Sequence, residues 1–112
     1  MAKVEIIESL KKEILKKFKS ESTIIFKLMK SLGDNPHKGK PLGHAGRFTI
    51  KELKYKKFRF YFIIDRSNIN ILSREELIDL LLKFVRMSEK KNQQKVINEI
   101  RNILIKLGPH GF

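Results

Sequence analysis

Residues 47–65, RFTIKELKYKKFRFYFIID, combine the strongest strand pattern of the chain with its densest positive charge. Every second residue in 58–64 is phenylalanine or isoleucine, the period of two that is typical of a β-strand whose faces meet different surroundings. Residues 49–55 predict a second strand, and the polar pair Lys56-Lys57 leaves room for little except a tight turn. The stretch therefore predicts a β-hairpin, and we expect its phenylalanines to face the core.

The register of this hairpin follows from the turn, because loops of two or four residues keep the same pairing. It places Lys54 opposite Arg59 and Glu52 opposite Tyr61. Two like charges directly opposite each other destabilise a sheet by up to about 1 kcal/mol unless an anion lies between them. A bound phosphate would remove this repulsion, and so would Glu52, which lies diagonal to Arg59. The register alone does not choose between a phosphate site and a salt-bridged sheet face.

The charge balance of the chain points to a polyanionic partner. The 112 residues include 25 Lys and Arg against 12 Asp and Glu, a formal net charge of +13. Eight basic and two acidic residues fall within residues 37–65, so the charge gathers on the hairpin and on the segment before it. Nucleic acid is the commonest polyanion in a cell, although a solubility charge or an acidic protein partner gives the same composition. The length predicts a single domain over residues 1–112.

Several classes of protein are excluded or disfavoured. The chain has no cysteine, which excludes disulfides, thiolate metal sites and a cysteine nucleophile. Its three histidines show no ligand spacing, so we expect neither a metal site nor a cofactor, and we expect His37 and His44 to be solvated. The N-terminus lacks the apolar core of a signal peptide, and no apolar run is long enough to span a bilayer. We therefore expect a cytoplasmic protein without membrane contact.

The segment before the hairpin predicts a short strand and two helices. Val4 and Ile6 alternate with charged residues, which suits a short strand. Apolar residues at helical spacing follow in residues 10–18 and 25–32, and we expect these amphipathic helices to pack as an antiparallel pair. Residues 34–46 are rich in glycine and proline and are interpreted as a loop.

The segment after the hairpin is less uniform. Residues 67–72 suit a short edge strand, and residues 73–76, SREE, match a capping box that begins a helix. Residues 78–87 are dense enough in apolar side chains to be a helical face or a central strand. Gly108 stops a final helix, and residues 110–112 are expected to form a frayed tail. That helix is predicted by apolar residues on one face: Val96, Ile100, Ile103, Leu104 and Leu107.

Two stretches resemble the RelE/ParE toxin superfamily, the ribosome-dependent messenger-RNA endonucleases and their relatives. One is NPHKGKPL followed by KELKYKKFRFYFIID, and the other is KFVRMSEKKNQQKVINEI, which is most similar to the HigB branch. The resemblance covers about residues 4–107. It implies an α+β fold in which an N-terminal helical hairpin packs on a curved antiparallel β-sheet with a basic concave face and a C-terminal helix alongside. It also favours a strand at residues 80–87, after a short helix at 74–79 that belongs to an insertion at 66–79.

The activity implied by the resemblance is that of a toxin-type endoribonuclease, which cleaves messenger RNA on the ribosome by attack of a ribose 2'-hydroxyl. By position in the motifs, the candidate catalytic residues are Lys54, Arg59 and Arg86. The two arginines would bind the scissile phosphate, and Lys54 would do the same or act as the general base. The candidate RNA-binding residues are Lys51, Lys56, Lys57 and Lys90. The implied partners are messenger RNA, the ribosome and a cognate acidic antitoxin.

The chain departs from the family at the groups that transfer protons. Many members place a tyrosine or histidine near the end of the last strand, where this chain reads RMSEKK at residues 86–91. Its only tyrosines are Tyr55 and Tyr61, and Glu89 is a candidate base. Two alternatives therefore stay open. One is a non-catalytic basic module that binds RNA or an acidic partner protein, and the other is a ParE-like toxin that acts on DNA gyrase.

Overall fold

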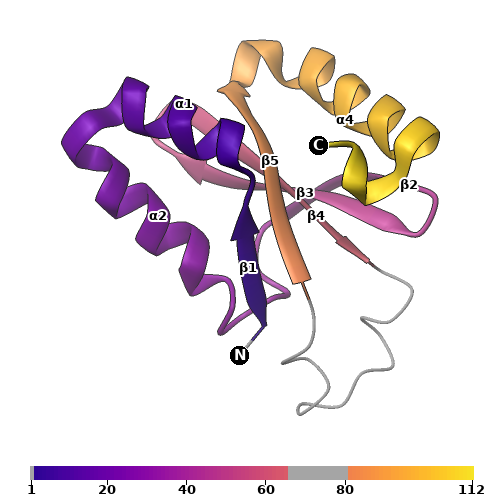
Figure 1. The fold of residues 1–112 in the computed structure, drawn as a ribbon, viewed down its shortest axis with the longest axis horizontal. Coiled ribbons are helices and arrows are strands. Elements are labelled where there is room, and N and C mark those ends of the chain that lie inside the picture. The colour runs from indigo at the N-terminus through magenta and orange to yellow at the C-terminus, as the bar shows by residue number, and fades with distance from the viewer. Residues whose placement is uncertain (1, 66–80) are drawn as a thin grey trace.

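A five-stranded mixed sheet in the order β1-β5-β4-β3-β2 forms the centre of the computed structural model, which describes residues 2–65 and 81–112 (Figure 1). Its strands are β1 (Lys3–Ile6), β2 (Lys40–Ala45), β3 (Phe48–Tyr55), β4 (Phe58–Asp65) and β5 (Leu81–Glu89). The α+β class is confirmed. Neighbouring strands from β2 to β5 are antiparallel, as expected, but the edge strand β1 runs parallel to β5. Such a pair is possible because α1, α2 and the other strands separate β1 from β5 in the chain.

Helices cover both faces of the sheet. They are α1 (Glu8–Phe18) and α2 (Ser22–Ser31) on one face and α4 (Gln93–Leu107) on the other (Figure 1). Phe18 of α1 packs with its ring centroid 5.0 Å from that of Phe58, whereas Gln93 of α4 bonds to a β3 side chain of the opposite face. Both alternating sets of β4 are therefore buried, Phe60 toward α1 and Tyr61 toward α4. The phenylalanine face predicted as core is confirmed, and the second face is also enclosed.

The predicted hairpin and its register are confirmed. Lys54 pairs with Arg59 and Glu52 pairs with Tyr61 across β3 and β4. The turn consists of Lys56 and Lys57, and Lys56 has a φ of 54°, in the left-handed region. Glycine is favoured at such a position because it has no Cβ to clash with the backbone.

We expect Lys56→Gly to raise the free energy of unfolding by about 1 kcal/mol, the order of the cost of left-handed backbone in a residue with a side chain. The exposed ion pair that Lys56 makes with Glu21 at 3.2 Å offsets little of this gain. Urea unfolding measures the change. Lys57→Gly is the matched control, because Lys57 lacks a positive φ, and it should lower stability. A loss of stability in both variants would contradict the prediction.

The interpretation of residues 34–46 as a loop is wrong over Lys40–Ala45, which form β2. Among the described residues, β2 lies at the sheet edge and pairs only with β3, with a register shift between Pro41 and Gly43. An edge strand needs only one row of backbone hydrogen bonds, so the missing N–H of a proline is tolerated there. His44 is exposed on this strand, and His37 is exposed in the turn before it.

The C-terminal region confirms two predictions and corrects two. Residues 81–89 are a strand, and Gly108, with a φ of 72°, ends α4. The buried face of α4 is Ile97, Ile100 and Leu104, while Leu107 is 67% exposed. The prediction of a frayed tail at residues 110–112 is also wrong. Gly108–Gly111 form a 3-10 turn, and Phe112 packs, partly buried, against the core. The strand, the capping box and the helix predicted within residues 66–80 lie outside the described part of the chain.

Candidate nucleic-acid interface

The structure places the three predicted catalytic residues on one face of the sheet, the face that α4 covers. Lys54 lies opposite Arg59 in the β3–β4 pair. Arg86 lies opposite Tyr61 in the β4–β5 pair, two residues along β4 from Arg59. Because side chains alternate along a strand, Lys54, Arg59 and Arg86 all point to the same side. The shared face of Lys54 and Arg59 that the register predicted is confirmed, and Arg86 lies on the same face.

Arg59 is not free on this face. It is 7% exposed, and its Nε lies 3.7 Å from Oε2 of Glu52, which is 8% exposed. Nη1 of Arg59 donates to the backbone carbonyls of Lys56 and Phe58 at 3.3 Å and 3.1 Å. Glu52 accepts a hydrogen bond from Nε2 of Gln93 at 2.5 Å. These extra bonds offset the desolvation of the two charges, so at Arg59 the face is salt-bridged.

Arg86 is held by α4. Its Nε lies 2.6 Å from Oε1 of Glu99, and its Nη1 donates to the carbonyl oxygen of Val85 at 2.7 Å. Its guanidinium carbon lies 5.3 Å from the ring centroid of Phe112. The Arg86 side chain is 29% exposed and that of Glu99 is 48% exposed, so this pair reaches solvent and is weaker than a buried one.

Lys54 is the open cation of the set. Its side chain is exposed, and no carboxylate within residues 2–65 and 81–112 forms an ion pair with it. Solvent exposure of the three cations therefore increases from the buried Arg59 through the half-buried Arg86 to the exposed Lys54. A phosphate that approaches this face meets Lys54 first.

The four predicted RNA-binding lysines are not gathered in one place. Lys56 pairs with Glu21 at 3.2 Å and Lys57 pairs with Glu89 at 3.6 Å, both at the hairpin turn, while Lys90 is exposed before α4. Lys51 lies on the opposite face of β3, where it is 8% exposed and its Nζ donates to the carbonyl oxygen of His37 at 3.1 Å. The structure thus separates Lys51 from the other six candidates.

We expect Lys51→Met to raise the free energy of unfolding near pH 7 by about 1 kcal/mol, because an apolar side chain avoids the cost of burying an ammonium group. Burial lowers the pKa of Lys51 below its ordinary value of 10.5. Between those two pKa values the unfolded chain binds the additional proton, so wild-type stability rises with pH there.

The advantage of Lys51→Met should therefore shrink as the pH rises toward 10.5, which urea unfolding at several pH values measures. Lys54→Met, at an exposed lysine of the same strand, is the control and should show no such trend. An advantage of Lys51→Met that stays constant with pH would contradict the role of the buried charge.

Two polar groups of this face, the Tyr61 and Ser88 hydroxyls, were not predicted to be site residues from the sequence. The buried Tyr61 hydroxyl lies 2.7 Å from Oγ of Ser88, which donates to the carbonyl oxygen of Glu89 at 2.9 Å, so Tyr61 is the donor to Ser88. Burial raises the pKa of Tyr61. A tyrosine hydroxyl thus lies at the end of the last strand, but it comes from β4 and is enclosed.

Glu89, the candidate base, is a poor proton acceptor. The charge of Lys57, followed by a hydrogen bond from Lys91, lowers the pKa of Glu89. A carboxylate with a lowered pKa holds a proton less well, which weakens it as a base. Glu89 also lies opposite Phe58, on the other face of the sheet, whereas Glu52 lies on the face of the three cations and is itself paired with Arg59.

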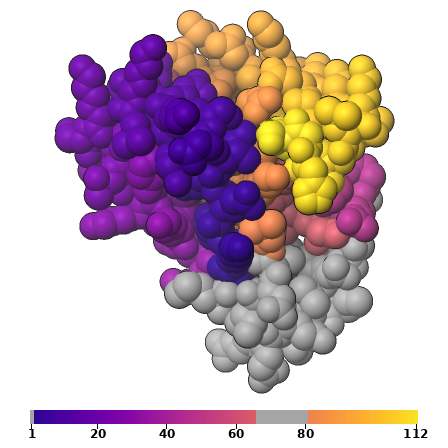
Figure 2. Space-filling model, in the orientation of Figure 1, coloured from indigo at the N-terminus to yellow at the C-terminus, as the bar shows by residue number. Residues whose placement is uncertain are grey.

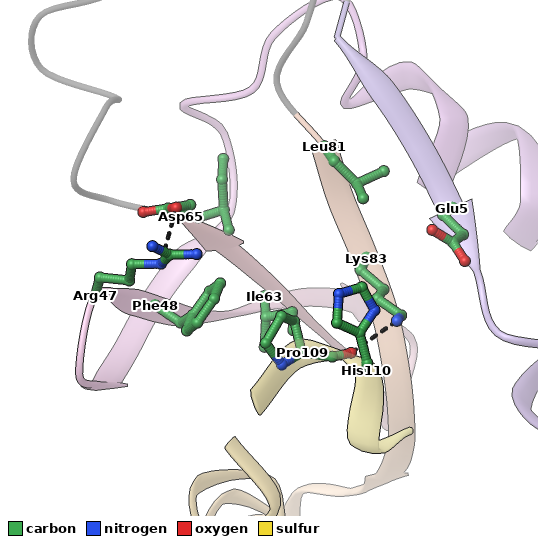
Figure 3. Close-up of a pocket in the computed structure, with 10 residues that line it drawn as sticks. Glu5, Arg47, Phe48, Ile63, Asp65, Leu81, Lys83, Pro109 and His110 are labelled. Carbon is green, nitrogen blue, oxygen red and sulfur yellow. Dashed lines mark hydrogen bonds and ion pairs between the residues drawn. The ribbon is translucent and has the colours of Figure 1, made fainter. Parts of the chain in front are cut away.

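A hollow lies at the end of the sheet away from the Lys56-Lys57 turn (Figure 3). Arg47 pairs there with Asp65 at 3.1 Å, and Nζ of Lys83 donates to the carbonyl oxygen of Pro109 at 2.8 Å. Its walls reach Asp65 and Leu81, where the described segments end. Because these polar groups already contact one another, this hollow is not the candidate interface.

Comparisons with protein-family models, curated proteins and solved structures gave no match to this chain. In residues 2–65 and 81–112, no helix has the length and apolar content needed to cross a membrane. The same residues contain no group of three or more histidine, aspartate or glutamate side chains arranged to hold a metal ion.

Proposed function

We propose that this protein is a toxin-type endoribonuclease that cleaves messenger RNA on the ribosome. The observation that carries the proposal is the common position of Lys54, Arg59 and Arg86 on one sheet face, with Lys54 open to solvent. The order of strands and helices also agrees with the fold implied by the resemblance to RelE/ParE toxins.

The chemistry needs three things: removal of the 2'-hydroxyl proton, stabilisation of the negative charge at phosphorus, and protonation of the leaving 5'-oxygen. A phosphate held by Lys54 lies beside Arg59 and competes with Glu52 for the guanidinium. Glu52 is then the carboxylate that accepts the 2'-hydroxyl proton. The 2'-oxygen bonds to phosphorus, the bond to the 5'-oxygen breaks, and that oxygen takes a proton from the Lys54 ammonium or from water.

An acidic antitoxin is the protein partner in this proposal. An acidic segment would bind the same cations through charge complementarity and would exclude RNA from them. The proposal therefore predicts competition between an acidic antitoxin and RNA, with both interactions weakened by salt.

One observation favours a second function, a non-catalytic module that binds RNA or an acidic protein. Both arginines are already ion-paired with carboxylates of the chain, Arg59 with Glu52 and Arg86 with Glu99. A face neutralised in this way attracts a polyanion through Lys54 and the surrounding lysines, but it does not offer two free guanidinium groups to a transition state.

Purified protein incubated with translating ribosomes distinguishes the two functions. Mapping of RNA ends should show cuts in messenger RNA that depend on the protein, and added antitoxin-like acidic peptide should suppress them. Salt-dependent RNA binding without new ends would select the non-catalytic module. Binding that ignores salt would overturn both functions, since each depends on phosphate contacts.

A further inference from the structure

A groove of about 530 Å³ lies between α1 and α4 at the end of β5. β1 pairs only with residues 81–84 of β5, so no strand in the described part of the chain adjoins residues 85–89 on that side. The groove occupies this place, and β5 is visible between the two helices (Figures 1 and 2). Lys17 of α1 lies on one wall, and Lys91 and Lys95 lie on the other.

The groove is lined by three lysines and three carboxylates, and the partners of two of those carboxylates, Lys57 and Arg86, give the groove and its rim together an excess of positive charge. Its three carboxylates are those of Glu13, Glu89 and Glu99. Glu89 is paired with Lys57 at 3.6 Å and with Lys91 at 3.4 Å, and Glu99 is paired with Arg86. No ion pair within residues 2–65 and 81–112 involves Lys17 or Lys95, which are both exposed. Lys17 and Lys95, one on each wall, are therefore available to an anion, and Glu13, which makes no ion pair within the same residues, offsets one of these two charges.

The lining suits a nucleic-acid strand better than a peptide. Only three of its eleven residues, Phe58, Met87 and Val96, are apolar, so it offers no deep pocket for apolar side chains. Asn92 adds a side-chain amide, a group that can bond to phosphate or ribose. The N-terminus of α4 also opens here, and its N-cap Asn92 makes no side-chain capping hydrogen bond. The positive end of the helix dipole therefore faces the groove.

An aromatic ring fixes part of this charge at the rim. Phe58 lies on the floor of the groove, with Nζ of Lys17 at 5.1 Å and Nζ of Lys57 at 5.6 Å from its ring centroid. Ammonium groups at this distance are attracted by the ring, which favours positions near the groove over free rotation in solvent. Lys57 belongs to the hairpin turn, so the groove is continuous with the β3–β4 hairpin.

The groove also meets the candidate interface through Glu99. This residue lines the groove and pairs with Arg86 of the sheet face at 2.6 Å. We infer that the groove binds the stretch of single-stranded RNA next to the phosphate held on the sheet face, with Lys17 and Lys95 each contacting a phosphate. This inference rests on the proposed function and names a second, flanking part of the same binding surface.

The test compares two double variants by fluorescence anisotropy with labelled single-stranded RNA of about ten nucleotides, within the size range of single-strand binding sites. Lys17→Gln with Lys95→Gln removes the groove cations. Lys30→Gln with Lys106→Gln removes two exposed lysines that do not line the groove, and it is the matched control. Affinities are measured over a range of salt concentrations, and a trinucleotide serves as a ligand too short to reach both surfaces.

For the longer RNA, affinity should depend less steeply on salt. Loss of two phosphate contacts should reduce the magnitude of the slope of log affinity against log salt by about 1.4, since each contact contributes about 0.7 on single strands. For the trinucleotide, which cannot contact both surfaces at once, the change in slope should be smaller than for the longer RNA. The inference is overturned if the groove variant keeps the slope of the control. Polyglutamate is measured as a second, acidic ligand, and a groove variant that loses affinity for polyglutamate but not for RNA also overturns the inference, because the groove would then bind an acidic protein. Wild-type protein that binds no RNA would instead refute the proposed function, on which the groove depends.

Discussion

Glu52→Ala should lower the free energy of unfolding by about 3 kcal/mol, the order of magnitude for breaking a buried ion pair from one side. The variant leaves the guanidinium of Arg59, which is 7% exposed, without its carboxylate. It also removes the acceptor of the Gln93 hydrogen bond, which joins β3 to α4. Urea or thermal unfolding of the two proteins at the same pH measures the difference.

Glu99→Ala is the matched control, because it removes the carboxylate of the other arginine on the same face. This pair is partly exposed, so its loss should cost less than about 1 kcal/mol. The double variant Glu52→Leu with Arg59→Met should recover most of the stability lost in Glu52→Ala, since apolar side chains remove both buried charges together. A small effect of Glu52→Ala would mean that Arg59 is solvated, and would leave it free for a phosphate.

The features predicted correctly from the sequence are the local ones. The hairpin register depends only on the turn length and on alternation within residues 47–65, and Lys54 lies opposite Arg59 as predicted. β2 was missed because Pro41 and Gly43 are loop signals, and only the place of Lys40–Ala45 at the sheet edge makes them compatible with a strand. The strand at residues 81–89 required the resemblance, because apolar density alone does not separate a strand from a helix.

The candidate site shows the same division. Alternation predicts the common face of Lys54 and Arg59, and the same alternation places Lys51 on the other face of the strand. Lys51 and Lys54 are three residues apart, so a strand places them on opposite faces. Glu99 and Gln93 were not predicted as partners because their contacts depend on where α4 packs. The position of α4 depends on which of its residues are buried against the sheet. The sequence pattern predicted Ile100 and Leu104 of this buried face but not Ile97.

Lys54→Ala is expected to reduce the rate of messenger-RNA cleavage by about 100-fold, the effect of removing one positively charged or hydrogen-bonding group from a developing oxyanion. Replacing Lys54 separates an effect on activity from an effect on stability, because Lys54 is exposed and makes no ion pair with a carboxylate of residues 2–65 and 81–112. Its removal should therefore change the free energy of unfolding by less than about 0.5 kcal/mol. Glu52→Ala would also reduce activity in the proposed mechanism, but its loss of stability would obscure the cause.

The rate is measured as product per unit time with ribosome-bound messenger RNA at saturating protein. Lys106→Ala, an exposed lysine of α4 away from the sheet face, removes the same charge and should cleave at the wild-type rate. Lys54→Arg keeps the charge and should retain more activity than Lys54→Ala, although the guanidinium is longer and planar. Equal cleavage by wild type and Lys54→Ala would move the reaction away from this face, because the one solvated cation of the set would then have no part in holding the scissile phosphate.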